Sequence, residues 1–383
     1  MGGIVYIQNL VKALGMLAPD QRARIELFLI AASTADPTPY ASLQPLVDHL
    51  CLEPCLSLSF FNRLRRRVGR AVAQLEDPCL ARLAQRHKLD FLYPVMGSFG
   101  ASLALGCYWA GWIPDFQHKI LPHLFSATEH RSRDREIARL AQEAPTLVFS
   151  SQSALQDFRR FYPTLPAMPV VLRFRTVPEA NWFEGDPVET QRRYELPDEF
   201  LLVSNQFWHH KNHRALFEAL YLLKQQGIRP LVVCTGKLHD YRFPQYGEEL
   251  LALIKEYEIE AQVRFLGLIP RQDQIQLMRR ALAVIQPSLF EGWSTVVEDA
   301  RLLGKPLILS DLEVHLEQDP PYGYFFARHE PAALAETIQS TLPHLLPGPD
   351  WSREQKAYAE SLVQCQTYAQ EFLKIASTAR DRA

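Results

Sequence analysis

The second half of the chain alternates short apolar runs with longer amphipathic stretches. The apolar runs have the length of buried strands, and the stretches between them repeat their apolar positions with a helical period. The pattern predicts strands over residues 200–204, 230–234, 263–265, 282–285 and 307–309, and helices over 213–226, 247–257, 272–281, 330–342 and 351–376. Strands that alternate with helices of this length predict a parallel, doubly wound sheet with right-handed crossovers.

The first half of the chain shows the same kinds of segment in a less regular order. Strands are predicted over residues 24–30, 89–95, 107–113, 146–149 and 168–172. A helix is predicted over residues 6–15, directly after Gly2 and Gly3. An open α/β domain usually begins with a strand before such a glycine pair. We therefore expect the N-terminal domain to lack its first strand, or the chain to begin further upstream.

The length and composition of the chain limit its class. At 383 residues it suits two domains of ordinary size, and Pro178, Gly185 and Pro187 mark a linker between them. A hydrophobic share of 47% and a charged share of 22% are typical of globular proteins. The net charge of −2 supplies no basic field for nucleic acid, so no nucleic-acid partner is expected. No apolar run reaches the roughly 18 residues of a membrane span, and no signal peptide is recognised.

The cysteines indicate the redox compartment. All six are scattered, and most lie in apolar surroundings, so we expect reduced, buried thiols in a cytoplasmic protein. Cys51 and Cys55 are near neighbours, but no second Cys/His pair follows at zinc spacing. The sequence therefore predicts no metal site.

A dense basic run lies on a predicted helix in the first half, formed by Arg63, Arg65, Arg66, Arg67 and Arg70. Such a run can contact anionic lipid head groups, which would place the protein at the inner membrane face, or an anionic acceptor. A solvated helix face is the commoner explanation for a run of this kind.

The stretch from Pro287 to Pro306 carries the strongest chemical pattern. Glu291 and Gly292 lie in a loop after a predicted strand. Thr295 and Glu298 have the spacing of a capping box, so we expect a helix that starts at Thr295 and ends near Gly304.

The start of this helix predicts an anion site. The unpaired backbone N–H groups of Ser294, Thr295 and Val296 should point forward from it. Asp299 lies at the edge of the apolar face, where its side chain can lean into a crevice. A loop carboxylate, an anion site and a second carboxylate one turn into the helix are what a phosphorylated sugar ligand needs.

This stretch resembles the signature of the family 4 retaining glycosyltransferases. Phe290-Glu-Gly-Trp-Ser294 fits its first half, Asp299 stands eight residues after Glu291 where the family usually has Glu, and Gly304-Lys-Pro306 fits its end. The resemblance implies the α/β GT-B fold, in which two Rossmann-like doubly wound parallel-sheet domains face a cleft. It implies an acceptor-side domain over residues 1–180, a nucleotide-sugar domain over 195–360, and a helix over 361–383 that crosses back to the first domain.

The resemblance also implies roles for residues of the second domain. Glu291 would bind sugar hydroxyls near the transferred carbon, and Asp299 would hold the ribose hydroxyls. Lys211 would bind the donor diphosphate together with the helix N–H groups. Gln206 stands where the family usually has a second cation, and Asn205, His209 or His210 would compensate. The loop from Phe265 to Pro270, with Leu268, would read the base through its backbone.

In the first domain the matches are less complete. Gly2 and Gly3 match a turn that approaches the donor phosphate and the acceptor, although a flexible terminal pair is an equal alternative. Asp115 matches one member of a His-Asp pair, but Pro114 replaces the histidine. We expect His118 to supply the imidazole instead, and the alternative is a surface loop histidine.

Together these patterns predict a retaining, hexosyltransferase-like enzyme that moves a sugar from a nucleotide-sugar donor to a glycan, lipid or small-molecule acceptor. No cofactor is expected besides the donor itself. One alternative is a catalytically weak or inactive nucleotide-sugar-binding partner protein on the same fold. A sugar-nucleotide epimerase is a further alternative, against which the signature argues.

Overall fold

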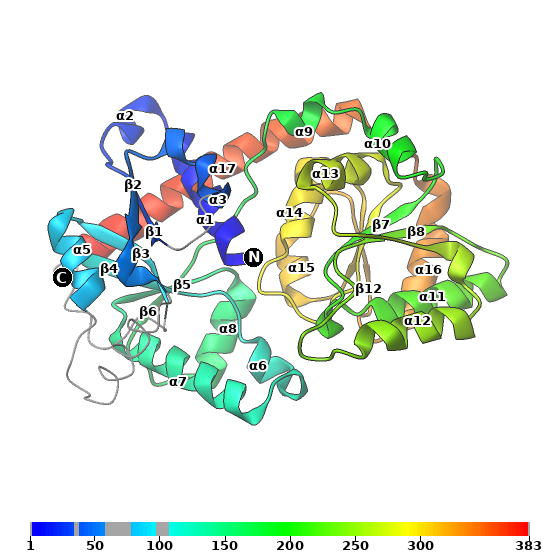
Figure 1. Cartoon of the computed structure of the whole chain (residues 1–383), viewed down its shortest axis with the longest axis horizontal. Coiled ribbons are helices and arrows are strands. Elements are labelled where there is room, and N and C mark those ends of the chain that lie inside the picture. Colours follow the sequence, from blue (N-terminus) through cyan, green and yellow to red (C-terminus); the bar gives the residue numbers. More distant parts are fainter. Residues whose placement is uncertain (1, 34–37, 58–77, 97–106, 382–383) are drawn as a thin grey trace. The chain divides into compact units, whose positions relative to one another are not determined.

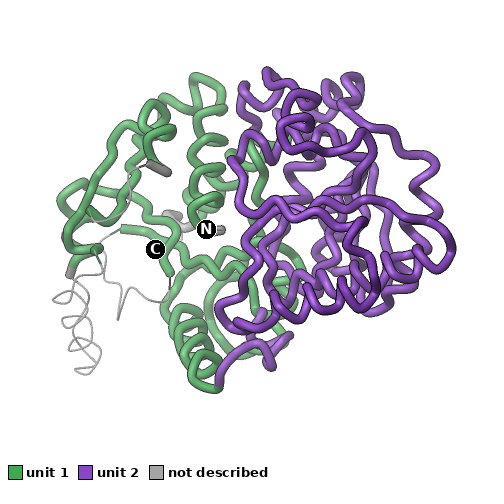
Figure 2. The backbone as a smooth tube through the Cα atoms, turned by 45° about the vertical axis from the view of Figure 1, so that its right-hand side comes forward, with its two compact units in different colours: residues 1–116, 127–177, 363–383 green, residues 117–126, 178–362 purple. Residues whose placement is uncertain are grey.

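Parallel strands organise both halves of the chain (Figure 1). The computed structural model describes residues 2–33, 38–57, 78–96 and 107–381. It divides into two compact units, which Figure 2 colours separately. Unit 1 comprises residues 1–116, 127–177 and 363–383, and unit 2 comprises residues 117–126 and 178–362.

Unit 2 is built on a six-stranded sheet in the order β12-β11-β10-β7-β8-β9. Every neighbouring pair is parallel, which confirms the predicted doubly wound α/β architecture. The strands are β7 (Leu201–Ser204), β8 (Val232–Thr235), β9 (Val263–Gly267), β10 (Val284–Gln286), β11 (Leu307–Ser310) and β12 (Gly323–Phe326). The short β12 was not predicted.

Helices cover both faces of this sheet (Figure 1). Leu201 and Val203 of β7 join a core cluster with α11 and α12, whereas Leu202 joins the cluster of α13 and α14 on the opposite face. Successive residues of a strand point to opposite faces, so a strand covered on both sides is apolar throughout. The helices are α9 (Asn181–Glu184), α10 (Pro187–Arg193), α11 (His213–Gln225), α12 (Tyr246–Glu256), α13 (Arg271–Arg280), α14 (Thr295–Leu302), α15 (Glu313–Gln318) and α16 (Pro331–Thr341).

The strand order reverses between β7 and β10, which are adjacent in the sheet although β8 and β9 separate them in sequence. In open α/β sheets, ligands bind outside the carboxyl ends of the strands at such a reversal. The loops that leave β7 and β10 at this point are residues 205–212 and 287–294. These loops contain Lys211 and Glu291.

Unit 1 has a four-stranded parallel sheet in the order β3-β4-β5-β6 and a separate parallel pair, β1-β2. The predicted strand over 24–30 begins only at Phe28, and β2 was not predicted because its residues are partly exposed. The strands are β1 (Phe28–Ala32), β2 (His49–Glu53), β3 (Phe91–Val95), β4 (Tyr108–Ile113), β5 (Thr146–Phe149) and β6 (Met168–Val171). The helices are α1 (Gly2–Gly15), α2 (Pro19–Arg22), α3 (Thr38–Ala41), α5 (Pro78–Arg86), α7 (Ala127–Glu143) and α8 (Gln152–Phe161).

Helix α1 begins at Gly2, so Gly2 and Gly3 lie in its first turn. The prediction of a glycine turn before the helix was therefore wrong. Packing anchors the helix from its second turn onwards: the Tyr6 ring stacks on Trp112 with a centroid distance of 4.3 Å. Asn9 Oδ1 accepts a hydrogen bond from the backbone N–H of Val177 at 2.7 Å.

Helix α17 (Trp351–Asp381) runs through both compact units. Residues from Val363 onwards group with unit 1, where Tyr368 and Phe372 are buried. The Phe372 ring lies 5.3 Å from that of Tyr93 in β3, and the Cys365 thiol contacts the carbonyl of Thr176.

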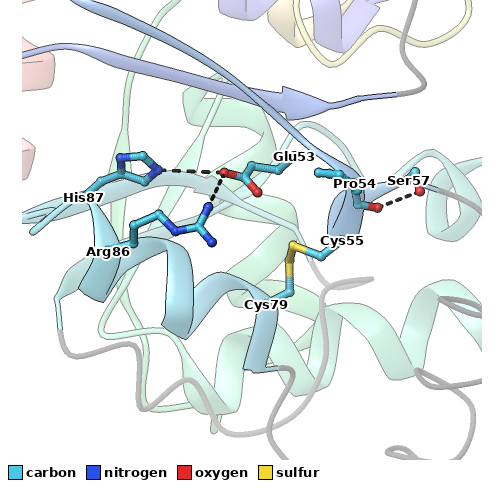
Figure 3. Close-up of a disulfide and its surroundings, with 7 residues drawn as sticks. All are labelled: Glu53, Pro54, Cys55, Ser57, Cys79, Arg86 and His87. Atoms are coloured by element: carbon cyan, nitrogen blue, oxygen red, sulfur yellow. Dashed lines mark hydrogen bonds and ion pairs between the residues drawn. A yellow bond between two sulfur atoms is a disulfide. The ribbon is translucent and has the colours of Figure 1, made fainter.

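The structure contains a disulfide between Cys55 and Cys79, shown in Figure 3. Cys55 lies in the short η2 turn (Pro54–Leu56), and Cys79 lies at the start of α5. The expectation of reduced thiols was therefore wrong for this pair, because the fold joins cysteines 24 positions apart. The other four cysteines form no disulfide. The basic run Arg63–Arg70 lies outside the described residues. None of the described helices combines the length and apolar character of a membrane span.

A buried ion pair joins α13 to the first turn of α17. The guanidinium of Arg279 donates to both carboxylate oxygens of Glu354, at 2.8 and 2.9 Å. Its remaining nitrogen donates to the carbonyls of Trp182 and Gly185, each at 3.1 Å. Since Arg279 is completely buried, its charge depends on these partners.

We predict that Glu354→Ala destabilises unit 2 by about 3–5 kcal/mol, because it leaves a buried guanidinium without its counter-ion. Urea unfolding followed by circular dichroism measures this loss. The matched control is Glu360→Ala on the same helix, whose carboxylate is half exposed and lies 4.0 Å from Lys356. Equal stabilities of the two variants would contradict the prediction.

Candidate active site

The two loops at the strand-order reversal are joined by an ion pair. Lys211 Nζ donates to Glu291 Oε1 at 2.5 Å, and the two side chains are only 14% and 10% exposed. A backbone hydrogen bond of 2.8 Å from Leu289 N to His210 O ties the same loops together. The structure thus brings together two candidates that are 80 positions apart in the sequence.

Two further donors hold the Glu291 carboxylate. Gln286 Nε2, at the end of β10, donates to Oε1 at 2.9 Å, and Ser288 Oγ donates to the same oxygen at 2.7 Å. Burial acts to raise the pKa of Glu291, but the charge of Lys211 and its hydrogen bond to the carboxylate outweigh it and lower the pKa below its ordinary value. Glu291 is therefore an ionised acceptor at neutral pH.

Three buried histidines surround this pair as neutral rings. Burial lowers the pKa of His210 and of His213 to about 3, and that of His315 to about 4. The backbone carbonyl of Ser310 accepts from His315 Nδ1 at 3.0 Å, so that nitrogen carries the proton. Burial also lowers the pKa of His209. His209 and His210 are therefore uncharged when no ligand is bound. They do not replace the second cation that the resemblance leads one to expect at the position of Gln206.

The predicted polar residues after β7 are engaged with neighbouring loops. Asn205 Nδ2 donates to Gln286 Oε1 at 2.6 Å, which links the ends of β7 and β10. Gln206 Oε1 accepts from the backbone N–H of Lys237 at 2.9 Å. The residue before Lys237 is Gly236. A Cβ atom at position 236 would lie 2.2 Å from the carbonyl oxygen of Asn205, so only glycine fits there.

Arg242 is a cation of this region that the sequence analysis missed. Its side chain is 8% exposed, and Nη1 donates to Gln117 Oε1 at 3.3 Å. Its guanidinium lies 5.0 Å from the ring centre of Phe125 and 6.0 Å from that of Trp208. Arg242 contributes to the lowered pKa of His210, so its field reaches the Lys211 loop. Arg242 lies in the loop between β8 and α12, and no sequence motif marks that loop.

The helix after Glu291 begins at Thr295, as predicted, but its N-cap is Ser294, whose Oγ accepts from Val297 N. The capping box assigned to Thr295 was wrong. Ser294 N–H donates to Gln318 Oε1 at 3.2 Å, so it is already bonded within the protein. Among the described residues, the backbone N–H groups of Thr295 and Val296 have no protein acceptor. The predicted anion site is therefore reduced to two donors.

Asp299 does not lean into open space. Its carboxylate is 1% exposed and lies 2.7 Å from Nη2 of Arg271, which is 43% exposed. Arg271 is the first residue of α13 and directly follows the loop from Phe265 to Pro270. Leu268 in that loop is 64% exposed.

The first-domain candidates separate between the two units. Asp115, Gly2 and Gly3 belong to unit 1. His118 lies in α6 (Gln117–Ile120), which groups with unit 2, and its ring is completely buried. The alternative of a surface loop histidine is thereby excluded for His118. Its ring packs edge-on against Phe125 at 6.3 Å.

The site therefore presents a buried carboxylate that can only accept hydrogen bonds, a lysine beside it, and two backbone donors at a helix start. Gly292 lies between Glu291 and that helix and is half-buried. Lysine and helix-terminal N–H groups bind phosphate, and a carboxylate binds sugar hydroxyls. This set of groups suits a ligand that carries both.

Comparisons with known proteins agree with this geometry. Residues 189–344 match the family model described as Glycosyl transferases group 1. This range contains Lys211, Arg271, Glu291 and Asp299. No curated protein matches the chain.

Solved structures match along almost the whole chain at low sequence identity. Sucrose-phosphate synthase from Thermosynechococcus elongatus has a TM-score of 0.68 at 16% identity, covering 99% of this chain and 94% of its own. Anabaena HepE in complex with UDP and glucose has a TM-score of 0.62 at 17% identity, covering 96% of each chain. WaaG, a glycosyltransferase involved in lipopolysaccharide biosynthesis, has a TM-score of 0.58 at 16% identity, covering 98% and 94%. Residues 189–344 thus match a glycosyltransferase domain, and the whole chain shares the GT-B fold of these solved structures.

Proposed function

We propose that this protein is a retaining glycosyltransferase that moves a sugar from a nucleoside-diphosphate sugar to a glycan, lipid or small-molecule acceptor. The observation that carries the proposal is the Lys211–Glu291 pair at the carboxyl ends of β7 and β10. It lies at the point of strand reversal where open sheets bind ligands, beside a helix start with free backbone donors.

Transfer breaks the bond between the sugar and the diphosphate, and negative charge grows on the departing phosphate oxygen. Lys211 Nζ and the N–H groups of Thr295 and Val296 would stabilise this charge. In a buried site these donors act more strongly than in water and need no rearrangement during the reaction. We propose that these groups, rather than a metal ion, neutralise the diphosphate.

Glu291 would bind hydroxyls of the transferred sugar. Gln286 and Ser288 hold its Oε1 together with Lys211, and the carboxylate retains further acceptor capacity. The acceptor would attack from the face that the diphosphate leaves, and a phosphate oxygen would take the acceptor's proton. The new glycosidic bond then forms on the same face as the broken one, and no protein nucleophile takes part.

Similar structures indicate where to begin the search for a donor. HepE has been crystallised with UDP and with UDP-glucose. We propose a nucleoside-diphosphate sugar for this chain and would test UDP-, GDP- and ADP-sugars in parallel. Peripheral membrane contact through Arg63–Arg70 remains part of the proposal, because a lipid-linked acceptor would require access to a membrane surface.

The proposal can be tested without knowing the acceptor. Slow hydrolysis of the donor by water, followed by proton NMR at early times, reveals the anomer that is released first. Release of the donor's own anomer supports retention, and release of the opposite anomer contradicts it. Binding of every donor without any turnover, with or without candidate acceptors, would instead favour a non-catalytic binding protein.

We predict that Lys211→Ala weakens binding of the nucleoside diphosphate by about 1.5–3 kcal/mol, because a charged hydrogen bond to phosphate is lost. The substitution also leaves Glu291 buried without its cation, so the pKa of Glu291 should rise. Isothermal titration with the nucleoside diphosphate measures the affinity.

The control for Lys211→Ala is Lys224→Ala, which removes the same charge from unit 2. Lys224 Nζ bonds to the carbonyls of Tyr257 and Glu258, away from the site. The Lys224 variant should bind like the unmodified protein. Unchanged affinity in the Lys211 variant would contradict the proposed phosphate contact.

We predict that Glu291→Gln reduces transfer about 100-fold while nucleoside diphosphate affinity changes little. The amide keeps the shape of the side chain but loses the charge that meets the sugar hydroxyls and Lys211. Steady-state kinetics and titration of the same preparation separate the two effects.

The control for Glu291→Gln is Glu313→Gln, at an exposed carboxylate that pairs with Arg328. It should leave both transfer and binding unchanged. A parallel fall of transfer and nucleotide affinity in the Glu291 variant would show that this carboxylate only supports the local structure.

A further inference from the structure

The carboxylate predicted to hold the nucleotide ribose is covered by protein. Asp299 is 1% exposed, and Arg271 Nη2 lies 2.7 Å from its Oδ1. Arg271 is 43% exposed. At this position the group available to a ligand is therefore the guanidinium, and the carboxylate lies behind it.

The guanidinium is held in place by three contacts. Nη2 forms an ion pair with the Asp299 carboxylate, Gln274 Oε1 accepts a hydrogen bond from Nη1 at 3.0 Å, and the ring centre of Trp182 lies 5.0 Å from Cζ. Gln274 itself donates to Ser204 Oγ. An arginine fixed in this way loses little conformational freedom when it binds a ligand.

The same contacts place Arg271 at the ligand-binding edge of the sheet. Ser204 is the last residue of β7, and Arg271 follows the loop that leaves β9. Asp299 belongs to α14, whose first turn carries the proposed phosphate donors. The carboxyl ends of parallel strands lie along one edge, so Arg271 shares that edge with Lys211 and Glu291.

We propose that Arg271 binds the nucleoside of the donor by donating hydrogen bonds to the ribose hydroxyls, and that Asp299 is a positioning residue that acts through Arg271. This inference rests on the proposed function and assigns its nucleoside-binding group. A guanidinium has five N–H donors; the hydrogen bond to Gln274 uses one of them, and Asp299 contributes its charge as an ion pair. The remaining donors can serve ligand oxygens.

The inference is tested with the full chain and four proteins: unmodified, Arg271→Ala, Asp299→Asn and the double variant. UDP, GDP and ADP are titrated calorimetrically, and the tightest-binding one is used throughout. Arg271→Ala should weaken binding about tenfold or more, as loss of hydrogen bonds from a charged group. Asp299→Asn should weaken binding in the unmodified background but by less than about twofold in the Arg271→Ala background, because its effect passes through the arginine.

Ribose contact has its own readout. The unmodified protein should prefer the nucleoside diphosphate over its 2′-deoxy counterpart, and Arg271→Ala should bring this affinity ratio towards one. The matched control is Arg193→Ala, which removes an exposed arginine paired with Asp273 at 3.0 Å in the same unit. The control should keep both the affinity and the preference. Thermal unfolding of all variants verifies that each is folded.

Several results would overturn the inference. Equal losses from Asp299→Asn in both backgrounds would show that the carboxylate contacts the ligand itself. Tighter binding of the nucleoside diphosphate by Arg271→Ala would show that the arginine blocks the site and does not bind the ligand. If Lys211→Ala weakens binding and Arg271→Ala does not, the proposed function stands and only this inference fails. If the unmodified protein binds none of the three diphosphates, both are wrong.

Discussion

The site of this protein depends on one buried ion pair. Lys211 and Glu291 are almost fully withdrawn from water, and removing either charge alone would leave the other without compensation. Each comes from the loop that follows a strand, and β7 and β10 are neighbours only because the strand order reverses there. The topology of the sheet thus creates the pair, and the pair in turn holds both loops at the strand ends.

A polar network behind the pair fixes the position of the carboxylate. Ser288 Oγ donates to Glu291, while the backbone carbonyl of Ser288 accepts from Ser310 Oγ at 2.7 Å. The Ser310 carbonyl accepts from His315, whose pKa burial lowers to about 4. Neutral buried rings keep the local dielectric low without adding charge. The attraction between Lys211 and any anionic ligand is therefore only weakly screened.

Much of the second domain could be predicted because its strands are covered on both faces. A strand such as β7 is apolar at its first three positions, Leu201 to Val203, and the helices between strands keep their 3.6-residue period. The strand β2 in unit 1 escaped prediction because its residues are partly exposed and show no clear alternation. The loop position of Glu291 and the helix start at Thr295 were confirmed, since helix-start signals act locally, but the capping residue is Ser294.

The sequence by itself determined the alternation of strands and helices from β7 to β11, the loop that carries Glu291 and the chemical types of the site residues, since these depend on neighbours a few positions away. Only the tertiary structure decided which distant residues meet: Lys211 with Glu291, Arg271 with Asp299, Gln318 with Ser294 and Cys55 with Cys79. Such contacts depend on strand order and side-chain burial, which are properties of the folded chain as a whole. For that reason a carboxylate expected to face a ligand was found behind an arginine that no pattern in the sequence had marked.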